Sequence, residues 1–171
     1  GSVSLSIPTY QMMLIEIGAA LIKQGFRHII LLNGNRPSGT ANDQVARHLI
    51  DEYDTLYEFM VSAVSYWEPA AAEIHKMRKS AEGGMGHAGE LETSFQLATR
   101  PHLVKMELLE GAHYGPVAWD LVAPTHPTRT YSKRPRPQVG HAAIFGDPTY
   151  ATADMGNSCI RVIVDALEHT F

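Results

Sequence analysis

The segment best suited to chemistry is a glycine-rich loop that presents a histidine and leads into two carboxylates. It reads Gly86-His87-Ala88-Gly89-Glu90-Leu91-Glu92-Thr93-Ser94. Glycines allow the backbone to approach a ligand closely, and a histidine beside a carboxylate can bind a metal ion or act as an acid/base pair. A structural interpretation stays open, because Glu90 and Glu92 can instead complement a helix dipole while His87 lies in a polar loop.

Two further candidates follow apolar segments that predict strands. Asn33-Gly34-Asn35 comes directly after one such segment, and Tyr66-Trp67 ends another. Ligands of open α/β sheets bind at the carboxyl ends of strands, so Asn35 could bind a substrate and Trp67 could line a pocket. The alternatives are a plain turn at Asn-Gly and a core position for the tryptophan, and the residues alone favour these.

The hydrophobic pattern predicts the elements that must position these residues. Apolar residues recur at intervals of three and four through Met12, Ile15, Ala19 and Ile22, which indicates a helix. The predicted helices span 8–25, 42–53, 69–79, 91–99 and 149–171, and the predicted strands span 28–32 and 56–66. A helix that ends shortly before an apolar strand is typical of an α/β fold with a mainly parallel sheet.

The segments between these elements add two expectations. Asn42 or Asp43 is expected to cap the second helix, and Thr149 the last one. Residues 111–140 form an irregular stretch that holds five prolines. A loop of that length is unusual unless it is functional, so we expect a long loop or lid there.

Composition and charge narrow the classes of function. The 171 residues suffice for one domain with a sizeable core, since 44% are apolar and 19% are charged. A net charge of −4 gives no overall attraction to nucleic acid or to an anionic membrane, and we expect neither as a partner. The single cysteine, Cys159, fits a reducing compartment and hence a cytoplasmic location. No apolar run reaches the roughly 20 residues of a membrane span.

Five segments, in this order, resemble the creatininase (creatinine amidohydrolase) family. Residues 1–5 resemble its Gly-Thr-x-Ser-Leu segment, 25–34 resemble its strand leading to Asn-Gly-His, and 65–67 are similar to a Ser-Tyr-Trp in that family. Residues 86–94 resemble its most specific stretch, and 145–153 resemble its closing Gly-Asp-Pro-x-x-Ala-Thr-Ala. Together the five segments extend over nearly the whole chain.

The resemblance implies a three-layer αβα sandwich with a mainly parallel sheet. Members hydrolyse non-peptide C–N bonds in cyclic or related small amides and use one or two divalent metals such as Zn, Mn or Fe. Many are homohexamers, so a higher oligomer is expected. The family's first metal ligands lie in an N-terminal segment that has no counterpart here, so residues 1–171 resemble its C-terminal two-thirds, a single but N-terminally incomplete domain. A second chain resembling that segment is the expected partner, and it would share the metal.

The resemblance also implies roles for single residues. His87 matches a histidine that contacts substrate and serves in proton transfer, and Glu92 matches a glutamate that can be a metal ligand. Trp67 matches an aromatic residue that forms a lid over the pocket. Together with Asn35 and Glu90, it is expected to bind the substrate. Asn35 also stands where the family has the histidine ligand of Asn-Gly-His, and a neutral amide oxygen is a poor replacement for imidazole at a transition metal.

Three functional hypotheses follow. In the first, the chain is one subunit of a composite, metal-assisted hydrolase: the metal lowers the pKa of a bound water, and His87 protonates the leaving nitrogen. In the second, the chain is a noncatalytic creatininase-like subunit that scaffolds or regulates an active homologue. In the third, the fold is the same, but Asn35 and Arg36 bind an anionic substrate in a site without a metal. Asn35 favours the second hypothesis, and the retained 86–94 segment favours the first.

Overall fold

The computed structural model describes residues 3–109, 120–122 and 144–171. The chain divides into two compact units, Gly1–Tyr66 and Trp67–Phe171, which are described here one at a time. The loop or lid predicted at 111–140 lies outside the described residues except for 120–122. None of the helices in the described ranges is long and apolar enough to cross a membrane.

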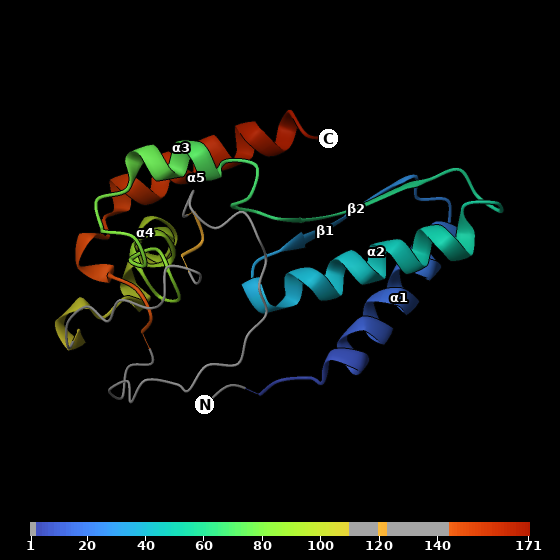
Figure 1. Ribbon diagram of the computed structural model, residues 1–171, viewed down its shortest axis with the longest axis horizontal. Helices are drawn as coiled ribbons and strands as arrows, with labels where there is room; N and C mark the ends of the chain where they lie inside the picture. Colours follow the sequence, from blue (N-terminus) through green and yellow to red (C-terminus); the bar gives the residue numbers. More distant parts are fainter. Residues whose placement is uncertain (1–2, 110–119, 123–143) are drawn as a thin grey trace. The chain divides into compact units, whose positions relative to one another are not determined.

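The first unit pairs two parallel strands with two helices. Its elements are α1 (Ile7–Lys23), β1 (His28–Asn33), the 3-10 turn η1 (Arg36–Ser38), α2 (Gly39–Tyr53) and β2 (Met60–Ser65). The strands pair in parallel with Ile29 opposite Val61 and Asn33 opposite Ser65. The two helices lie side by side against the strands (Figure 1). The predicted α/β fold with a parallel sheet is confirmed.

The ends of α1 form where the sequence predicts them. Ser6 caps the helix by accepting a hydrogen bond from the Thr9 amide, and Pro8 occupies the first turn. Gly25 follows the helix with a φ of +96°, a left-handed conformation that favours glycine. The chain can therefore turn at once into β1.

One face of the two strands forms the core of this unit, and the other is open. The core cluster joins both helices to both strands and consists of Ala19, Ile22, Ile29, Val45, Ala46, Leu49 and Val61. Side chains alternate across a strand, so the next residues of β1 point the other way. There Ile30 is 43% exposed and Leu32 is 57% exposed.

Three predicted boundaries are wrong, each for a local reason. α2 begins at Gly39 instead of Asn42 or Asp43, because η1 leads directly into it and Asn42 is buried inside the helix, where it accepts a hydrogen bond from Tyr10 (2.8 Å). β2 begins at Met60, later than predicted, since a turn at 54–56 and irregular residues at 57–59 follow α2. The last helix is capped by Thr152 and not by Thr149.

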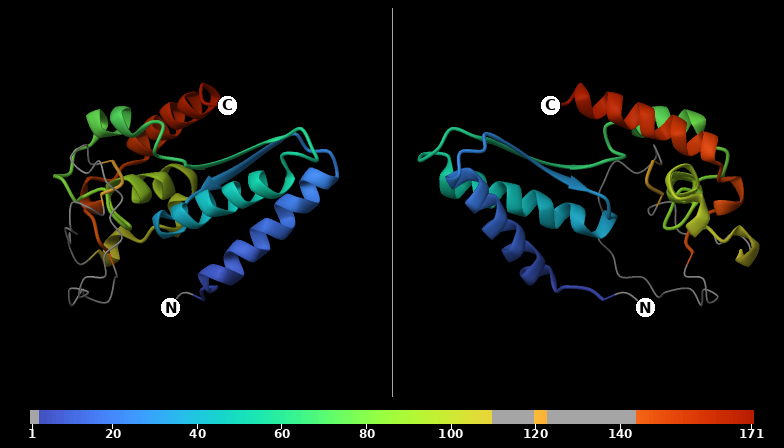
Figure 2. Two further views of the ribbon diagram at one scale, coloured as in Figure 1. Left: turned by 45° about the vertical axis from the view of Figure 1, so that its right-hand side comes forward. Right: turned by 180° about the vertical axis from the view of Figure 1, so that it is seen from behind.

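The second unit is built from helices and a compact loop. Its elements are α3 (Ala71–Met77), α4 (Glu90–Thr99), the 3-10 turns η2 (Pro101–Leu103), η3 (Met106–Leu108) and η5 (Pro148–Tyr150), and α5 (Ala153–Glu168). Figure 2 shows α3 alongside α5 in both views, and α4 also packs on α5. A Cβ at Gly156 would stand 2.1 Å from the Ser94 carbonyl oxygen, so the close crossing of α4 and α5 requires glycine there.

Candidate functional site

The glycine-rich loop brings His87 and Glu92 together at the start of α4. The Nδ1 atom of His87 lies 3.7 Å from Oε2 of Glu92. The imidazole is 69% exposed and the carboxylate 32% exposed, so solvent and small molecules can reach both. Such an exposed pair contributes little to stability. It does place an imidazole, which can act as an acid or a base, beside a carboxylate.

Glu92 also fixes the backbone of the loop. Its Oε2 accepts a hydrogen bond from the Ala88 amide (2.6 Å), and the Thr93 hydroxyl donates to the Ala88 carbonyl (3.1 Å). Ala88 has a φ of +52°, which costs an L-residue conformational energy. A glutamate in the first turn of a helix that reaches back to an amide before it resembles a capping box. The carboxylate therefore joins the loop conformation to the position of His87.

A later segment of the same chain, around Phe145, crosses the loop at His87. The Phe145 amide donates to the His87 carbonyl oxygen (2.9 Å), and the two residues form an isolated antiparallel bridge. The crossing is tight because a Cβ at Gly86 would stand 2.0 Å from the Phe145 carbonyl oxygen. One at Gly89 would stand 2.1 Å from the Gly84 carbonyl oxygen. The glycines of this loop are thus required by close backbone contact.

Glu90 has a structural role. Its side chain is fully buried, and its carboxylate accepts hydrogen bonds from the backbone amides of Lys79 (2.9 Å) and Ser80 (2.8 Å). This burial favours a role in fixing the loop over the predicted contact with substrate. Burial, and to a smaller extent the charge of Glu90, raises the pKa of the Cys159 thiol to about 11. A buried, protonated thiol is a poor nucleophile.

The other predicted site residues belong to different surroundings. Asn35 is exposed at the start of η1. Its side chain donates to the Ser38 hydroxyl (3.3 Å), and its backbone N–H donates to the side-chain oxygen of Asn33 (3.1 Å). Trp67 is only 4% exposed, which favours the core position over the pocket wall. Asn35 belongs to the first unit and the other candidates to the second. Within the second unit, the structure brings His87 and Glu92 together.

Sequence reasoning missed two polar contacts near the candidates. At the carboxyl end of β1, the buried Asn33 donates to the Ser65 hydroxyl on β2 (3.1 Å). In the second unit, Arg78 and Asp120 form a buried ion pair of 2.8 Å beside the glycine-rich loop. A polar residue at the end of a strand is a usable signal for the first pair. Nothing in the spacing of Arg78 and Asp120 indicates the second.

The described residues do not fit a complete metal centre. In 3–109, 120–122 and 144–171, no cluster of three or more His, Cys, Asp and Glu side chains could hold a metal ion. His87 and Glu92 offer two donors, whereas catalytic zinc sites typically use three protein ligands. Any such metal would need ligands from outside the described residues.

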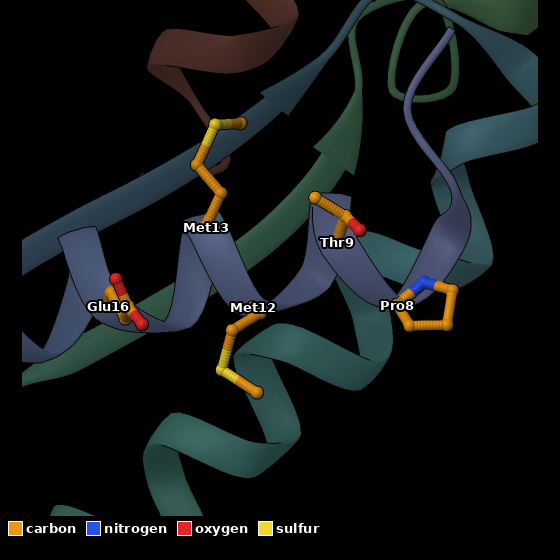
Figure 3. A pocket seen from close by; sticks show the side chains of 5 residues that line it. All are labelled: Pro8, Thr9, Met12, Met13 and Glu16. Atoms are coloured by element: carbon orange, nitrogen blue, oxygen red, sulfur yellow. The ribbon is translucent and has the colours of Figure 1, made fainter.

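A hollow of the described surface lies on α1, away from these candidates in the sequence. It has a volume of about 480 Å³, and its lining residues are Pro8, Thr9, Met12, Met13 and Glu16 (Figure 3). All five come from a single helix, so the hollow is a shallow surface feature. With one carboxylate among its lining residues, it offers no acid/base pair.

The chain is similar to a known family and to several solved structures. A family model described as creatininase (creatinine amidohydrolase) matches residues 1–171. Among solved structures, a mutant creatininase in complex with creatine is 22% identical with a TM-score of 0.72, and the match covers 99% of this chain and 66% of that one. A mutant creatininase of Zn–Zn type is 22% identical (TM-score 0.71; coverage 99% and 65%). A manganese creatininase is 22% identical (TM-score 0.72; coverage 99% and 65%).

These solved structures share their fold with the chain. At this identity they show the fold alone, and the chain spans just under two thirds of the length of the structures it matches. No curated protein sequence matches the chain.

Proposed function

The chain belongs to the creatininase family, and on that premise we propose that it hydrolyses a non-peptide C–N bond as one subunit of a composite, metal-assisted amidohydrolase. The observation that carries this proposal is the solvent-accessible His87–Glu92 pair, which lies on a glycine loop that the Phe145 segment crosses. The proposed substrates are cyclic or related small amides.

The step assigned to this chain is a proton transfer. When the C–N bond of the substrate breaks, the nitrogen needs a proton, and the protonated His87 imidazole donates it. Water supplies the hydroxyl group that remains on the carbonyl carbon, and the proton that water loses restores the imidazolium. Oε2 of Glu92 lies 3.7 Å from Nδ1 of the ring. That placement leaves Nε2 as the nitrogen directed to the substrate.

The divalent metal is proposed to be shared with a second polypeptide. The metal-bearing neighbours support a metal, while the described residues offer too few donors to hold one. We assign no reaction step of this chain to it. Glu92 is the residue of this chain proposed to reach it.

The exposed apolar surface of the first unit supports a partner. Ile30 and Leu32 lie on the open face of the sheet, and Met12 (56%) and Ile17 (51%) are exposed on α1. Apolar surface of this kind marks interaction sites. The proposed occupant is a chain resembling the family's N-terminal segment, within a higher oligomer.

The alternative is a noncatalytic scaffold or regulatory subunit. The incomplete set of metal ligands among the described residues favours it. Replacing His87 distinguishes the two functions, with creatinine as the first substrate tested in the natively assembled protein. We expect His87→Ala to lower kcat by about 10²–10⁴-fold, the usual range for general acid–base catalysis. An assembly that keeps its full rate after this change would leave only the scaffold function.

A further inference from the structure

A buried carboxylate outside the loop holds the backbone that leads to His87. The Oδ2 atom of Asp120 accepts hydrogen bonds from the amides of Gly83 (2.7 Å) and Met85 (3.3 Å). The same oxygen lies 2.8 Å from Nη2 of Arg78. The Asp120 side chain has no exposed surface, and Arg78 is 8% exposed. Charge-assisted hydrogen bonds in such surroundings are strong and fix geometry.

Backbone hydrogen bonds also join the Asp120 segment to the loop. The Leu121 amide donates to the Met85 carbonyl (3.1 Å), and the Met85 side chain is fully buried. The other oxygen of Asp120 accepts from the Val122 amide (3.1 Å), so the carboxylate also fixes its own segment. Met85 precedes His87 by two residues. Residues 120–122 therefore hold the N-terminal side of the loop, while Phe145 holds it at His87 itself.

Arg78 ties the same carboxylate to the start of the loop. Its guanidinium donates to the carbonyl oxygens of Ser80 (3.0 Å) and Ala81 as well as to Asp120. Removing Asp120 would leave a buried cation and two backbone amides without this acceptor, and each loss is costly in a buried site. The backbone around residues 83–85 would then be free to shift.

We propose that Asp120 is a positioning residue for His87, acting through the amides of Gly83 and Met85. This inference rests on the proposed function, in which His87 donates the proton. It goes beyond that function by assigning a task to a residue that touches neither the imidazole nor Glu92. It also assigns a purpose to one part of the 111–140 stretch: residues 120–122 fasten the loop to the body of the unit.

The test compares two substitutions in the natural assembly with creatinine as the probe substrate. Asp120→Asn keeps the shape of the side chain and removes its charge, whereas Thr152→Ala removes the cap of α5 in the same unit without touching the loop. We expect Asp120→Asn to lower kcat by about 10²-fold and to change KM by less than about threefold, because a misplaced donor slows chemistry more than binding. Thr152→Ala should leave both constants unchanged.

A double substitution separates positioning from general damage. In the His87→Ala background, Asp120→Asn should lower kcat no further, since the group that it positions is absent. Hydrogen exchange gives a readout without turnover: the Gly83 and Met85 amides should exchange faster in Asp120→Asn and not in Thr152→Ala. Equal loss of kcat in both backgrounds, or unchanged exchange at both amides, would overturn the inference. If His87→Ala itself keeps the full rate, the proposed function fails and this inference fails with it.

Discussion

Gly86→Ala tests whether the tight crossing at His87 is required for the fold of the loop. The new Cβ would stand 2.0 Å from the Phe145 carbonyl oxygen, and this neighbour is backbone, which cannot rotate away. Because non-bonded atoms need about 3.5 Å, the two segments must separate by more than about 1 Å. We expect overpacking to cost about 1–3 kcal/mol and the lost Phe145–His87 hydrogen bond about 1 kcal/mol. The expected loss in unfolding free energy is therefore about 2–4 kcal/mol.

The assay is urea unfolding of the natural assembly followed by circular dichroism, together with kcat for creatinine. Ala88→Gly is the matched control, because it makes the opposite change in the same loop. It relieves the φ of +52°, but it also gives the unfolded chain more freedom, so its stability should stay within about 1 kcal/mol of the parent. Gly86→Ala should also lower kcat. Stability within about 0.5 kcal/mol of the parent, with kcat unchanged, would refute the steric argument.

Three further changes have defined outcomes. Trp67→Ala should lower the unfolding free energy by about 3–5 kcal/mol, as for a core tryptophan, and a raised KM at unchanged stability would contradict this. Cys159 should resist iodoacetamide at pH 8 until the protein unfolds, because burial raises its pKa from 9.0 to about 11. Since the folded-state pKa is the higher one, the thiol's contribution to stability is present below pH 9 and is lost as the pH rises to 11. Asn35→His should raise the zinc content of the assembly, measured by elemental analysis, and an unchanged content would speak against Asn35 as the replaced ligand.

Local patterns in the sequence predict much of the fold. The helix 8–25 and the strand 28–32 agree with α1 and β1, because periodicity, Pro8 and Gly25 all act within a few residues. The predicted helix boundaries are wrong where another local structure forms at the same residues. η1 replaces the expected cap of α2, and Asp147 caps η5 by accepting from Thr149, which moves the cap of α5 to Thr152.

The candidate site is less predictable, because burial is decided by contacts distant in sequence. His87 and Glu92 are close along the chain, so their pairing follows from one loop and one helix turn. Glu90 belongs to the same segment, yet it is buried against residues 79–80, and no spacing rule distinguishes it from Glu92. Asp120 is 42 residues from Arg78, in a stretch without periodicity, so their ion pair is visible only in three dimensions.

Native mass spectrometry with metal analysis of the natural assembly tests the central claim most directly. That claim is that the chain supplies a proton donor to an amidohydrolase whose metal ligands lie mostly in a partner. We expect the 18.8 kDa chain to be found with a second polypeptide and a stoichiometric divalent metal, and Glu92→Gln to lower the metal content. A well-folded, monodisperse 18.8 kDa species at micromolar concentration, without a partner or metal and without amidase activity, would contradict the account.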